Sequence, residues 1–183
     1  GHGQSQKQKS RRIAELCKFD LQTQMVYEFP ELQGIMGEVY AGFKGEEPEI
    51  CRGIREYYLP RTAGDSLPKA PEPLPVALAD RMDLLAVAFS LQIIPTGSAD
   101  PFALRRTAQG VVQIVLELRL SLDWPELACR AVEALQKQQE SIPESGILQE
   151  QLVEFLHQRE RWFLQDRGFR YDLVEALLRH PEG

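Results

Sequence analysis

The stretch EFPELQGIMGEVYAGF, from Glu28 to Phe43, contains both the start signal and the repeating apolar pattern of a helix. Phe29 precedes a proline and should leave helical space, whereas Pro30 suits the first turn of a helix, where a missing N–H costs nothing. The apolar residues that follow recur at helical spacing and predict one face of a single helix that begins at Pro30. These residues are Leu32, Ile35, Met36, Val39, Tyr40 and Phe43.

Helices are predicted on both sides of this stretch as well. Before it, apolar residues at every fourth position predict a helix from Ser10 to Glu28. After it, five prolines in residues 60–75 predict an extended loop. No segment alternates polar and apolar residues as a half-buried strand does, so we expect an all-α fold. Three further helices are predicted with both ends: Pro48–Leu59, Gly146–Arg167 with a stop at Gly168, and Tyr171–Arg179. Another helix is predicted to carry Leu78 and Phe89. Two more are predicted from their start signals, one that opens at Pro101 behind the cap Asp100 and one that opens at Asp123.

Changes in composition divide the chain into three parts. Residues 1–9 are polar and basic, and we expect them to form a tag or a disordered lead. Residues 10–140 are expected to form one helical bundle. The polar stretch QKQQESIPESG, residues 136–146, then predicts a boundary, after which residues 141–183 form a helical appendage.

The composition is that of an ordinary globular protein, and it limits the kinds of partner. The 183 residues are 43% hydrophobic and 26% charged, with a formal net charge of −6. A negative chain does not attract phosphates broadly, so any RNA contact must be local. Three separated cysteines form no C-x-x-C pair, and no apolar run is long enough to cross a bilayer. We expect a cytoplasmic protein with no membrane partner.

The motifs of enzyme chemistry are absent from the sequence. There is no phosphate-binding glycine loop and no G-x-S-x-G nucleophile elbow. The histidines are only His2, His157 and His180, too few for the converging ligands of a metal phosphohydrolase. Asp80 and Asp83 share one face of a predicted helix and could share a cation, but they equally fit a solvated face or an ion pair. No catalytic residue, bound metal or cofactor is predicted for this chain.

A groove without side chains is predicted where Gly34, Gly37 and Ala41 follow one another at helical spacing. Glycine inside a helix costs about 1 kcal/mol relative to alanine, so a close neighbour should offset this cost. The neighbour is either another helix or the backbone of a nucleic acid, and packing against a helix is the simpler explanation.

Local positive charge marks the candidate RNA contacts. Arg61 and Lys69 lie in the proline-rich loop, and Arg105 and Arg106 lie at a helix start. In an acidic chain these are the best places for phosphate contacts, although such side chains commonly remain solvated. A second, similar patch near the C-terminus consists of Arg159, Arg161, Arg167 and Arg170.

Four sequence blocks carry a family resemblance. They are FDLQTQMVYEFPELQGIMGEVYA (residues 19–41), REYYLPRTAGDSLP (55–68), ALADRMDLL (77–85) and IPTGSADPFALRR (94–106). In this order they resemble the β subunit of the bacterial glycyl-tRNA synthetase that is built from two α and two β chains. The later segment FLHQRERWFLQDRGFRYDLVEALL (155–178) is similar to the region that follows in this family, so the resemblance covers nearly the whole chain.

The resemblance implies the fold of the chain, its partners and the separate roles of the α and β subunits. In this family the α subunit carries the glycine and ATP site, while the longer β subunit contributes tRNA binding. The chain would be the HD-like helical domain of that β subunit together with helices that lead to the next domain. The chain alone would be catalytically inactive, and ATP would be used by the whole aminoacyl-tRNA synthetase. The partners of the chain would be the α subunit, tRNA(Gly) and the other β-subunit domains.

The HD-like label also implies a degenerate hydrolase site. A family pattern close to E-H-Y-L-P-R is present here as EYYLPR, from Glu56 to Arg61. Tyr57 therefore stands where histidine is often seen, and Asp80 and Asp83 would be relics of a metal site.

Three functions follow from these observations. The leading hypothesis is a non-catalytic module that helps to hold tRNA for aminoacylation by the α/β complex, with the basic residues of the loop and of the helix start as contacts. The first alternative is a residual HD-type metal phosphohydrolase that uses Asp80 and Asp83. The second is a structural intersubunit scaffold that touches no RNA.

Overall fold

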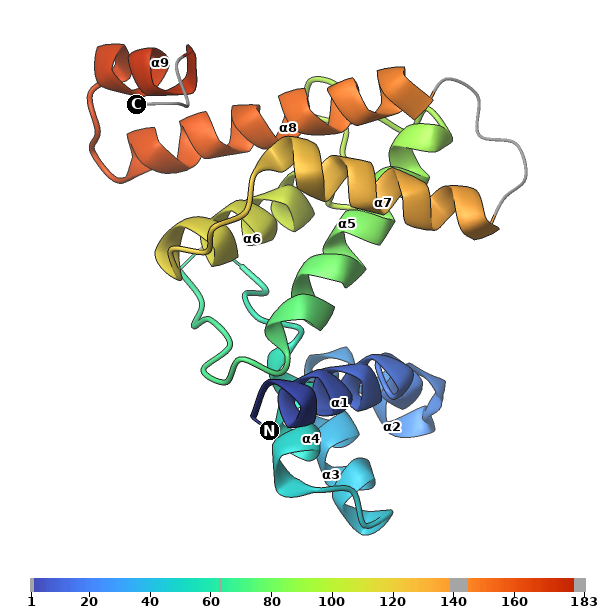
Figure 1. The fold of residues 1–183 in the computed structure, drawn as a ribbon. Coiled ribbons are helices and arrows are strands. Elements are labelled where there is room, and N and C mark those ends of the chain that lie inside the picture. Colours follow the sequence, from blue (N-terminus) through green and yellow to red (C-terminus); the bar gives the residue numbers. More distant parts are fainter. Residues whose placement is uncertain (1, 63, 139–144, 180–183) are drawn as a thin grey trace. The chain divides into compact units, whose positions relative to one another are not determined.

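The structure, a computed structural model, describes residues 2–62, 64–138 and 145–179. Within these residues it is all-α, as the sequence predicts (Figure 1). None of the helices in this part of the chain is both long and apolar enough to cross a membrane. The chain forms two compact units, unit 1 from Gly1 to Ala79 and unit 2 from Asp80 to Gly183.

Unit 1 is a set of short helices in which α4 packs against both α1 and α3 (Figure 1). Helix α1 begins at His2, so residues 2–9 are helical where the sequence predicts a tag or a disordered lead. An ion pair between Lys9 Nζ and Glu47, at 3.1 Å, ties this part of α1 to the start of α4. The elements are α1 (His2–Glu15), the 3-10 helix η1 (Phe19–Gln22), α2 (Gln24–Glu28), the 3-10 helix η2 (Pro30–Leu32), α3 (Ile35–Phe43), α4 (Pro48–Glu56) and the first part of α5 (Leu74–Ser90).

The prediction of one helix from Ser10 to Glu28 is wrong, because the backbone turns after α1. Lys18 adopts the left-handed conformation, with φ 62°, which interrupts helical geometry. Its backbone N–H donates to the hydroxyl of Tyr57 at 3.0 Å. Thr23 then caps α2, since its hydroxyl accepts from the backbone N–H of Val26 at 3.4 Å. The four-residue repeat of the sequence therefore extends over separate helices.

The helix predicted to begin at Pro30 is also interrupted, at Gly34. This residue has φ 79°, a conformation that glycine adopts without strain. Its N–H donates at 2.5 Å to the carboxylate of Asp20, which is fully buried. The hydroxyl of Tyr58 donates to the same carboxylate at 3.2 Å, and burial raises the pKa of Tyr58 to about 12, which keeps this hydroxyl protonated. Gly34 therefore separates η2 from α3.

Helix α3 turns its small residues inward, not the apolar face that the sequence predicts. Gly37 and Ala41 are buried, whereas Val39 is 40% and Phe43 is 83% exposed. A Cβ on Gly37 would lie 2.8 Å from Cγ2 of Ile54 on α4. Of the two neighbours considered for the glycine groove, the structure therefore has the helix, and close packing of α3 on α4 offsets the cost of glycine.

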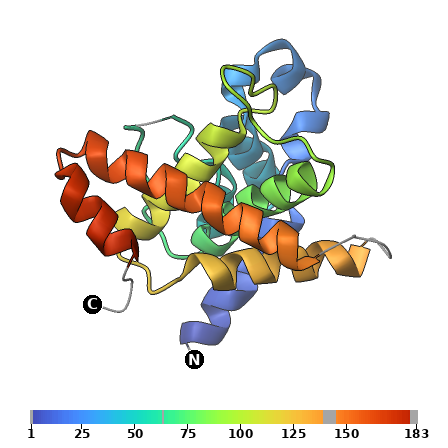
Figure 2. The same ribbon diagram turned by 90° about the horizontal axis from the view of Figure 1, so that it is seen from above.

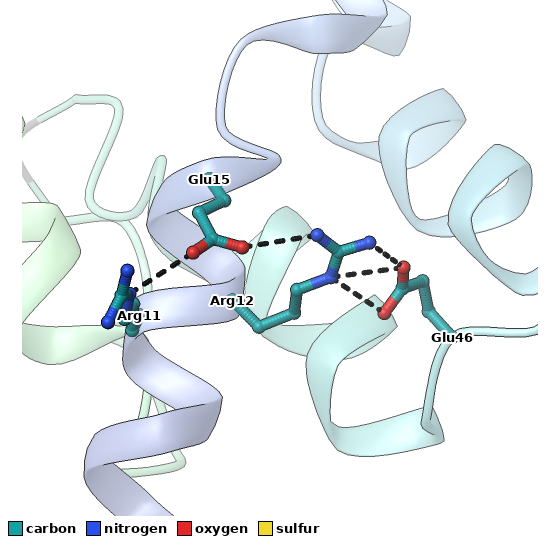
Figure 3. Close-up of polar contacts among 4 residues, drawn as sticks. All are labelled: Arg11, Arg12, Glu15 and Glu46. Atoms are coloured by element: carbon teal, nitrogen blue, oxygen red, sulfur yellow. Dashed lines mark hydrogen bonds and ion pairs between the residues drawn. The ribbon is translucent and has the colours of Figure 1, made fainter.

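A cluster of ion pairs joins α1 to the segment that precedes α4 (Figure 3). The guanidinium of Arg12 lies between two carboxylates: its Nε donates to the two oxygens of Glu46 at 3.1 and 3.2 Å, and its Nη1 donates to Glu15 at 3.1 Å. Arg11 contacts the other side of Glu15 at 3.2 Å. The hydrogen bonds from Arg12 hold the pKa of Glu46 below its usual value. Glu46 is therefore ionised in the folded state over a wider pH range than a free carboxyl group.

Unit 2 is a helical bundle around α8 (Figures 1 and 2). Helix α8 packs against α6 and α7, and α9 packs against α8. The unit contains the rest of α5 together with α6 (Leu104–Glu117), α7 (Trp124–Gln138), α8 (Ser145–Asp166) and α9 (Tyr171–Arg179).

Local start and stop signals place several boundaries of unit 2 as predicted. At the start of α7, Asp123 accepts a hydrogen bond from the backbone N–H of Glu126 at 2.6 Å. Gly168, with φ 84°, follows the end of α8. The predicted and observed bounds of α9 agree.

The division into a bundle and an appendage differs from the compact units of the structure. The predicted boundary between residues 140 and 141 falls within residues 139–144 and lies outside the described residues. Helix α8, expected in the appendage, packs against α6 and α7 because its apolar residues face them. The helices after the predicted boundary therefore share a unit with those before it.

A buried polar contact joins α7 to α8. The indole N–H of Trp124 donates to the carboxylate of Glu160 at 2.7 Å, and His157 Nδ1 lies 3.3 Å from the same oxygen. Glu160 is only 8% exposed, so these partners satisfy a carboxylate that water does not reach freely. Trp162, further along α8, is 45% exposed.

We predict that Gly37→Ala destabilises unit 1 and that Gly42→Ala does not. A methyl group at position 37 would meet the β-branched side chain of Ile54 and the carboxylate of Asp20, and such overpacking costs about 1–3 kcal/mol. At position 42 of the same helix nothing lies within 4 Å of an added Cβ, and alanine is the better helix former by about 1 kcal/mol. Urea unfolding of both variants measures the difference. Equal stabilities would contradict close packing of α3 on α4.

We predict that Glu46→Gln weakens the dependence of stability on acid pH. The pKa of Glu46 is lower in the folded state than in the unfolded state, where it is about 4.3. The stabilisation by Arg12 is therefore complete above about pH 4.3 and is lost as pH falls through the folded pKa. Urea unfolding at a series of pH values tests this. The variant should be less stable than the wild type at neutral pH and should lose less stability in acid, whereas Glu31→Gln, at an exposed position of η2, should keep the wild-type slope.

Candidate functional site

A pocket of about 480 Å³ lies within unit 2. Its wall is formed by the end of α5, the segment that follows it, the first turn of α6 and one face of α8. The apolar part of this wall consists of Phe89, Ile94, Pro95 and Phe155. Phe89 and Phe155 are almost fully buried, whereas Ile94 and Pro95 are partly exposed. The apolar surface open to a ligand is therefore mainly that of the segment after α5.

Arg105 is held at one side of this pocket by the start of α6. The carboxylate of Asp100 accepts from the backbone N–H of Leu104 at 2.7 Å and from that of Arg105 at 3.0 Å. Asp100 thus accepts from free N–H groups at a helix start, as predicted, but the helix begins at Leu104 and not at Pro101, and its N-cap position is Ala103. The Nη2 of Arg105 donates to the carbonyl of Gly97 at 2.9 Å. Arg105 is therefore anchored at its backbone and at one end of its guanidinium.

Arg159 reaches the same pocket from α8. Its guanidinium carbon lies 5.7 Å from the ring centroid of Phe155, and the Phe155 ring packs against Phe89 with centroids 5.1 Å apart. The Nε of Arg159 is buried and has no hydrogen-bond partner among the described residues. Burial lowers the pKa of Arg159, the nearby charge of Arg105 lowers it further, and Asp100 partly opposes both effects. The charge of Arg105 therefore disfavours that of Arg159, and Asp100 offsets part of this effect.

The other arginines of the C-terminal patch have acidic partners. Arg161 contacts Glu175, Arg167 contacts Glu117, and Arg170 contacts Asp172. In the described part of the chain, no ion pair includes Arg105 or Arg159. The patch that the sequence treats as uniform therefore contains one member, Arg159, whose charge a ligand could neutralise. Arg106, which follows Arg105 on α6, is exposed.

Acidic side chains border the pocket as well. Glu150 and Glu154 lie on α8, and Gln158 donates to Glu154 at 3.2 Å. Glu150 precedes Arg159 by nine residues, which corresponds to about 13 Å along a helix. The pocket therefore changes along α8 from an acidic border to a basic one.

The other predicted RNA contacts, Arg61 and Lys69, lie in unit 1. Arg61 donates through Nη1 to the carbonyl of Glu31 at 3.4 Å and through Nη2 to the carbonyl of Gln33, and its guanidinium carbon lies 5.9 Å from the ring centroid of Tyr58. These contacts give Arg61 a packing role between the loop and η2. Lys69 is exposed. Their roles as phosphate contacts stay predictions.

The three residues predicted to belong to a degenerate hydrolase site, Tyr57, Asp80 and Asp83, have different environments. Tyr57 is fully buried, and its hydroxyl accepts from the backbone N–H of Lys18. Asp80 is half-buried and Asp83 is exposed on α5. Among the described residues, no three His, Cys, Asp or Glu side chains form a group that could hold a metal ion.

Sequence reasoning identified Arg105 as a candidate but did not connect it with Arg159. The separation of four residues between Phe155 and Arg159 indicates that these two share a face of α8. No comparable signal joins that face to the segment after α5, because this contact depends on the tertiary packing of unit 2.

The model of the glycyl-tRNA synthetase beta subunit family matches residues 2–179 of this chain. The chain belongs to this family. The family resemblance that the sequence blocks indicate is thus confirmed, and the site described above lies in a region that the family model covers.

Relatives of this chain carry the name glycine–tRNA ligase beta subunit. The one from Halalkalibacterium halodurans is 55% identical over 168 residues, which are 91% of this chain and 24% of the relative. The one from Moorella thermoacetica is 48% identical over 168 residues, with the same shares. The one from Syntrophomonas wolfei is 44% identical over 185 residues, 98% of this chain and 26% of the relative. The chain therefore spans about a quarter of the length of the curated relatives it matches.

We predict that Arg159→Met leaves the melting temperature unchanged or raises it, whereas Arg161→Met lowers it. Methionine retains an apolar stem that packs on Phe155, and it removes a buried donor whose unsatisfied state costs about 1–3 kcal/mol. At position 161 the same change leaves the largely buried carboxylate of Glu175 without its arginine. Thermal unfolding followed by circular dichroism measures both. A larger loss in Arg159→Met than in Arg161→Met would show that the Arg159 guanidinium is satisfied within the fold.

Proposed function

We propose that this chain is a non-catalytic, tRNA-contacting part of the β subunit of glycine–tRNA ligase. The observation that carries the proposal is the pair Arg105 and Arg159, two arginines without an ion-pair partner that line one pocket. In a chain with a net charge of −6, contacts to RNA phosphates depend on such local concentrations of positive charge. Membership of the glycyl-tRNA synthetase beta subunit family supports tRNA as that RNA.

The anchoring of the two side chains supports this role. Arg105 is fixed by Asp100 and by the carbonyl of Gly97, and Arg159 is fixed by its packing on Phe155. Side chains that are ordered before binding lose less conformational entropy when they contact a ligand. Arg106, exposed on the same helix, adds positive charge that favours the approach of a polyanion.

The chemistry of aminoacylation is assigned to the α subunit in this proposal. That subunit would bind glycine and ATP, and this chain, an HD-like helical domain, would have no catalytic residue and no cofactor of its own. Its partners would be the α subunit, tRNA(Gly) and the remaining domains of the β subunit, in the cytoplasm. The absence of a phosphate-binding glycine loop from the sequence supports this division. The isolated chain is expected to form no glycyl-tRNA.

We predict that Arg105→Gln weakens the binding of tRNA(Gly) about 10-fold or more at low salt. A charge-assisted hydrogen bond contributes about 1.5–3 kcal/mol, and each factor of ten in affinity is about 1.4 kcal/mol. The plot of log affinity against log salt should also become shallower by about one contact. Fluorescence anisotropy with labelled tRNA(Gly) measures both quantities. In the α/β enzyme, the same substitution should raise the KM for tRNA and leave the KM for ATP unchanged.

The matched control for this prediction is Arg130→Gln. Arg130 is exposed on α7 of the same unit and contacts only Glu126 among the acidic groups within ion-pair distance in the described residues. The control makes the same change of charge and should leave tRNA affinity within about two-fold of the wild type, because Arg130 does not line the pocket and its charge is already paired with Glu126. Equal losses in both variants would mean that overall charge, and not the pocket, determines tRNA binding.

A further inference from the structure

The guanidinium of Arg159 offers a planar group to a ligand in the pocket. Its carbon lies 5.7 Å from the ring centroid of Phe155, and the side chain lines the pocket. Bases of single-stranded RNA stack on arginine planes as well as on aromatic rings. A base inside a duplex is already stacked on its neighbours and cannot stack on this group. The guanidinium therefore favours an unpaired base.

The size and the apolar wall of the pocket fit a ligand of this kind. A volume of about 480 Å³ is within the range of about 300–1,000 Å³ that is usual for small-ligand pockets. Ile94 and Pro95 offer apolar surface that is only half-buried in the protein itself. A base that covers these two side chains removes apolar area from water, which stabilises the bound state.

The position of Arg105 fits the phosphate of the same nucleotide. The charge of Arg105 disfavours that of Arg159, Asp100 offsets this only in part, and no acidic side chain of the described residues forms an ion pair with either arginine. An anion that contacts both removes this repulsion and provides acceptors for their N–H groups. The gain is charge-assisted and is larger than for a neutral ligand.

The acidic border distinguishes between possible anionic ligands. Glu150 and Glu154 repel further negative charge, so they disfavour an acidic peptide and a second phosphate along α8. Their carboxylates accept hydrogen bonds from the exocyclic amino groups of bases, as carboxylates accept from cytosine N4. Gln158, which donates to Glu154, lies between this border and Arg159. The ligand should therefore be negative at one end and carry N–H donors at the other.

We infer that the pocket holds one unpaired nucleotide of the tRNA that carries an exocyclic amino group. Its base stacks on Arg159 and covers Ile94 and Pro95, its amino group faces Glu150 and Glu154, and its phosphate contacts Arg105. The inference rests on the proposed function and adds to it the class of nucleotide that is recognised. Cytidine, adenosine and guanosine satisfy this description, and uridine does not.

Oligocytidylate and oligouridylate of equal length test the inference on the full chain. The two probes have the same backbone charge and similar rings. Cytosine carries an amino donor at C4 and an acceptor at N3, whereas uracil carries a carbonyl acceptor at C4 and an N–H donor at N3. Fluorescence anisotropy should give about 10-fold tighter binding of oligocytidylate, since one good base-edge contact corresponds to a factor of about 5–150. Arg159→Gln should weaken oligocytidylate and tRNA(Gly) binding about 10-fold and leave the weak binding of a blunt RNA duplex unchanged, because stacking on one base is lost.

Two further variants keep the experiment decisive. Arg170→Gln removes the same charge from an exposed arginine and should leave all three affinities unchanged. Arg159→Lys retains the charge but not the planar guanidinium, so it should still weaken oligocytidylate binding even if Arg159→Gln folds poorly. Circular dichroism confirms the folded state of each variant before binding is measured.

The possible results separate the inference from the proposed function. If the wild-type chain binds tRNA(Gly) and neither Arg159 variant changes this affinity, the pocket is not the nucleotide site, although tRNA contact elsewhere stands. If the wild-type chain binds neither tRNA(Gly) nor oligocytidylate, the proposed function itself fails. If a glutamate-rich peptide displaces oligocytidylate at comparable concentration, the pocket recognises protein and the inference is wrong.

Discussion

The fully buried carboxylate of Asp20 is the contact on which the rest of unit 1 depends. It accepts hydrogen bonds from Gly34 at the start of α3 and from Tyr58 just after α4, so one side chain of η1 fixes two later segments. A carboxylate without such donors would be costly to bury, since desolvation strongly disfavours an isolated charge. The close approach of α3 to α4 at Gly37 is possible only while these segments keep this register. The block from Glu28 to Phe43 is therefore a structural element.

Local signals in the sequence predict the fold well where a helix end is stabilised by its own neighbours. Asp123 and Gly168 each act within a few residues of their position, so the sequence alone contains the information. The helix bounds that were predicted wrongly depend instead on contacts between residues that are distant in sequence. Lys18 and Gly34 take left-handed conformations because Tyr57 and Asp20, distant in sequence, accept hydrogen bonds from their N–H groups. Helical periodicity continues through both breaks, so periodicity alone predicts helices that are too long.

In the candidate site too, some features can be predicted from neighbouring residues in the sequence, and others depend on the tertiary structure. Arg105 could be proposed from sequence because charge near a capped helix start is a local feature. Whether an arginine is neutralised by a neighbour depends on the tertiary structure: Arg161 and Arg159 look equivalent in sequence, yet only Arg161 contacts an acidic side chain. Arg61 is predicted from its charge to be an RNA contact, but its guanidinium donates to the backbone carbonyls of Glu31 and Gln33. Charge patterns thus indicate candidates, and packing distinguishes among them.

The tryptophans and most of the tyrosines of the chain lie in different units. Both tryptophans of the chain, Trp124 and Trp162, belong to unit 2, where one is buried and hydrogen-bonded and the other is partly exposed. Four of the five tyrosines, by contrast, lie in unit 1: Tyr27, Tyr40, Tyr57 and Tyr58. Tryptophan emission therefore reports on unit 2 alone, while tyrosine absorbance reports mainly on unit 1. The chain carries a separate optical probe for each unit, without any label.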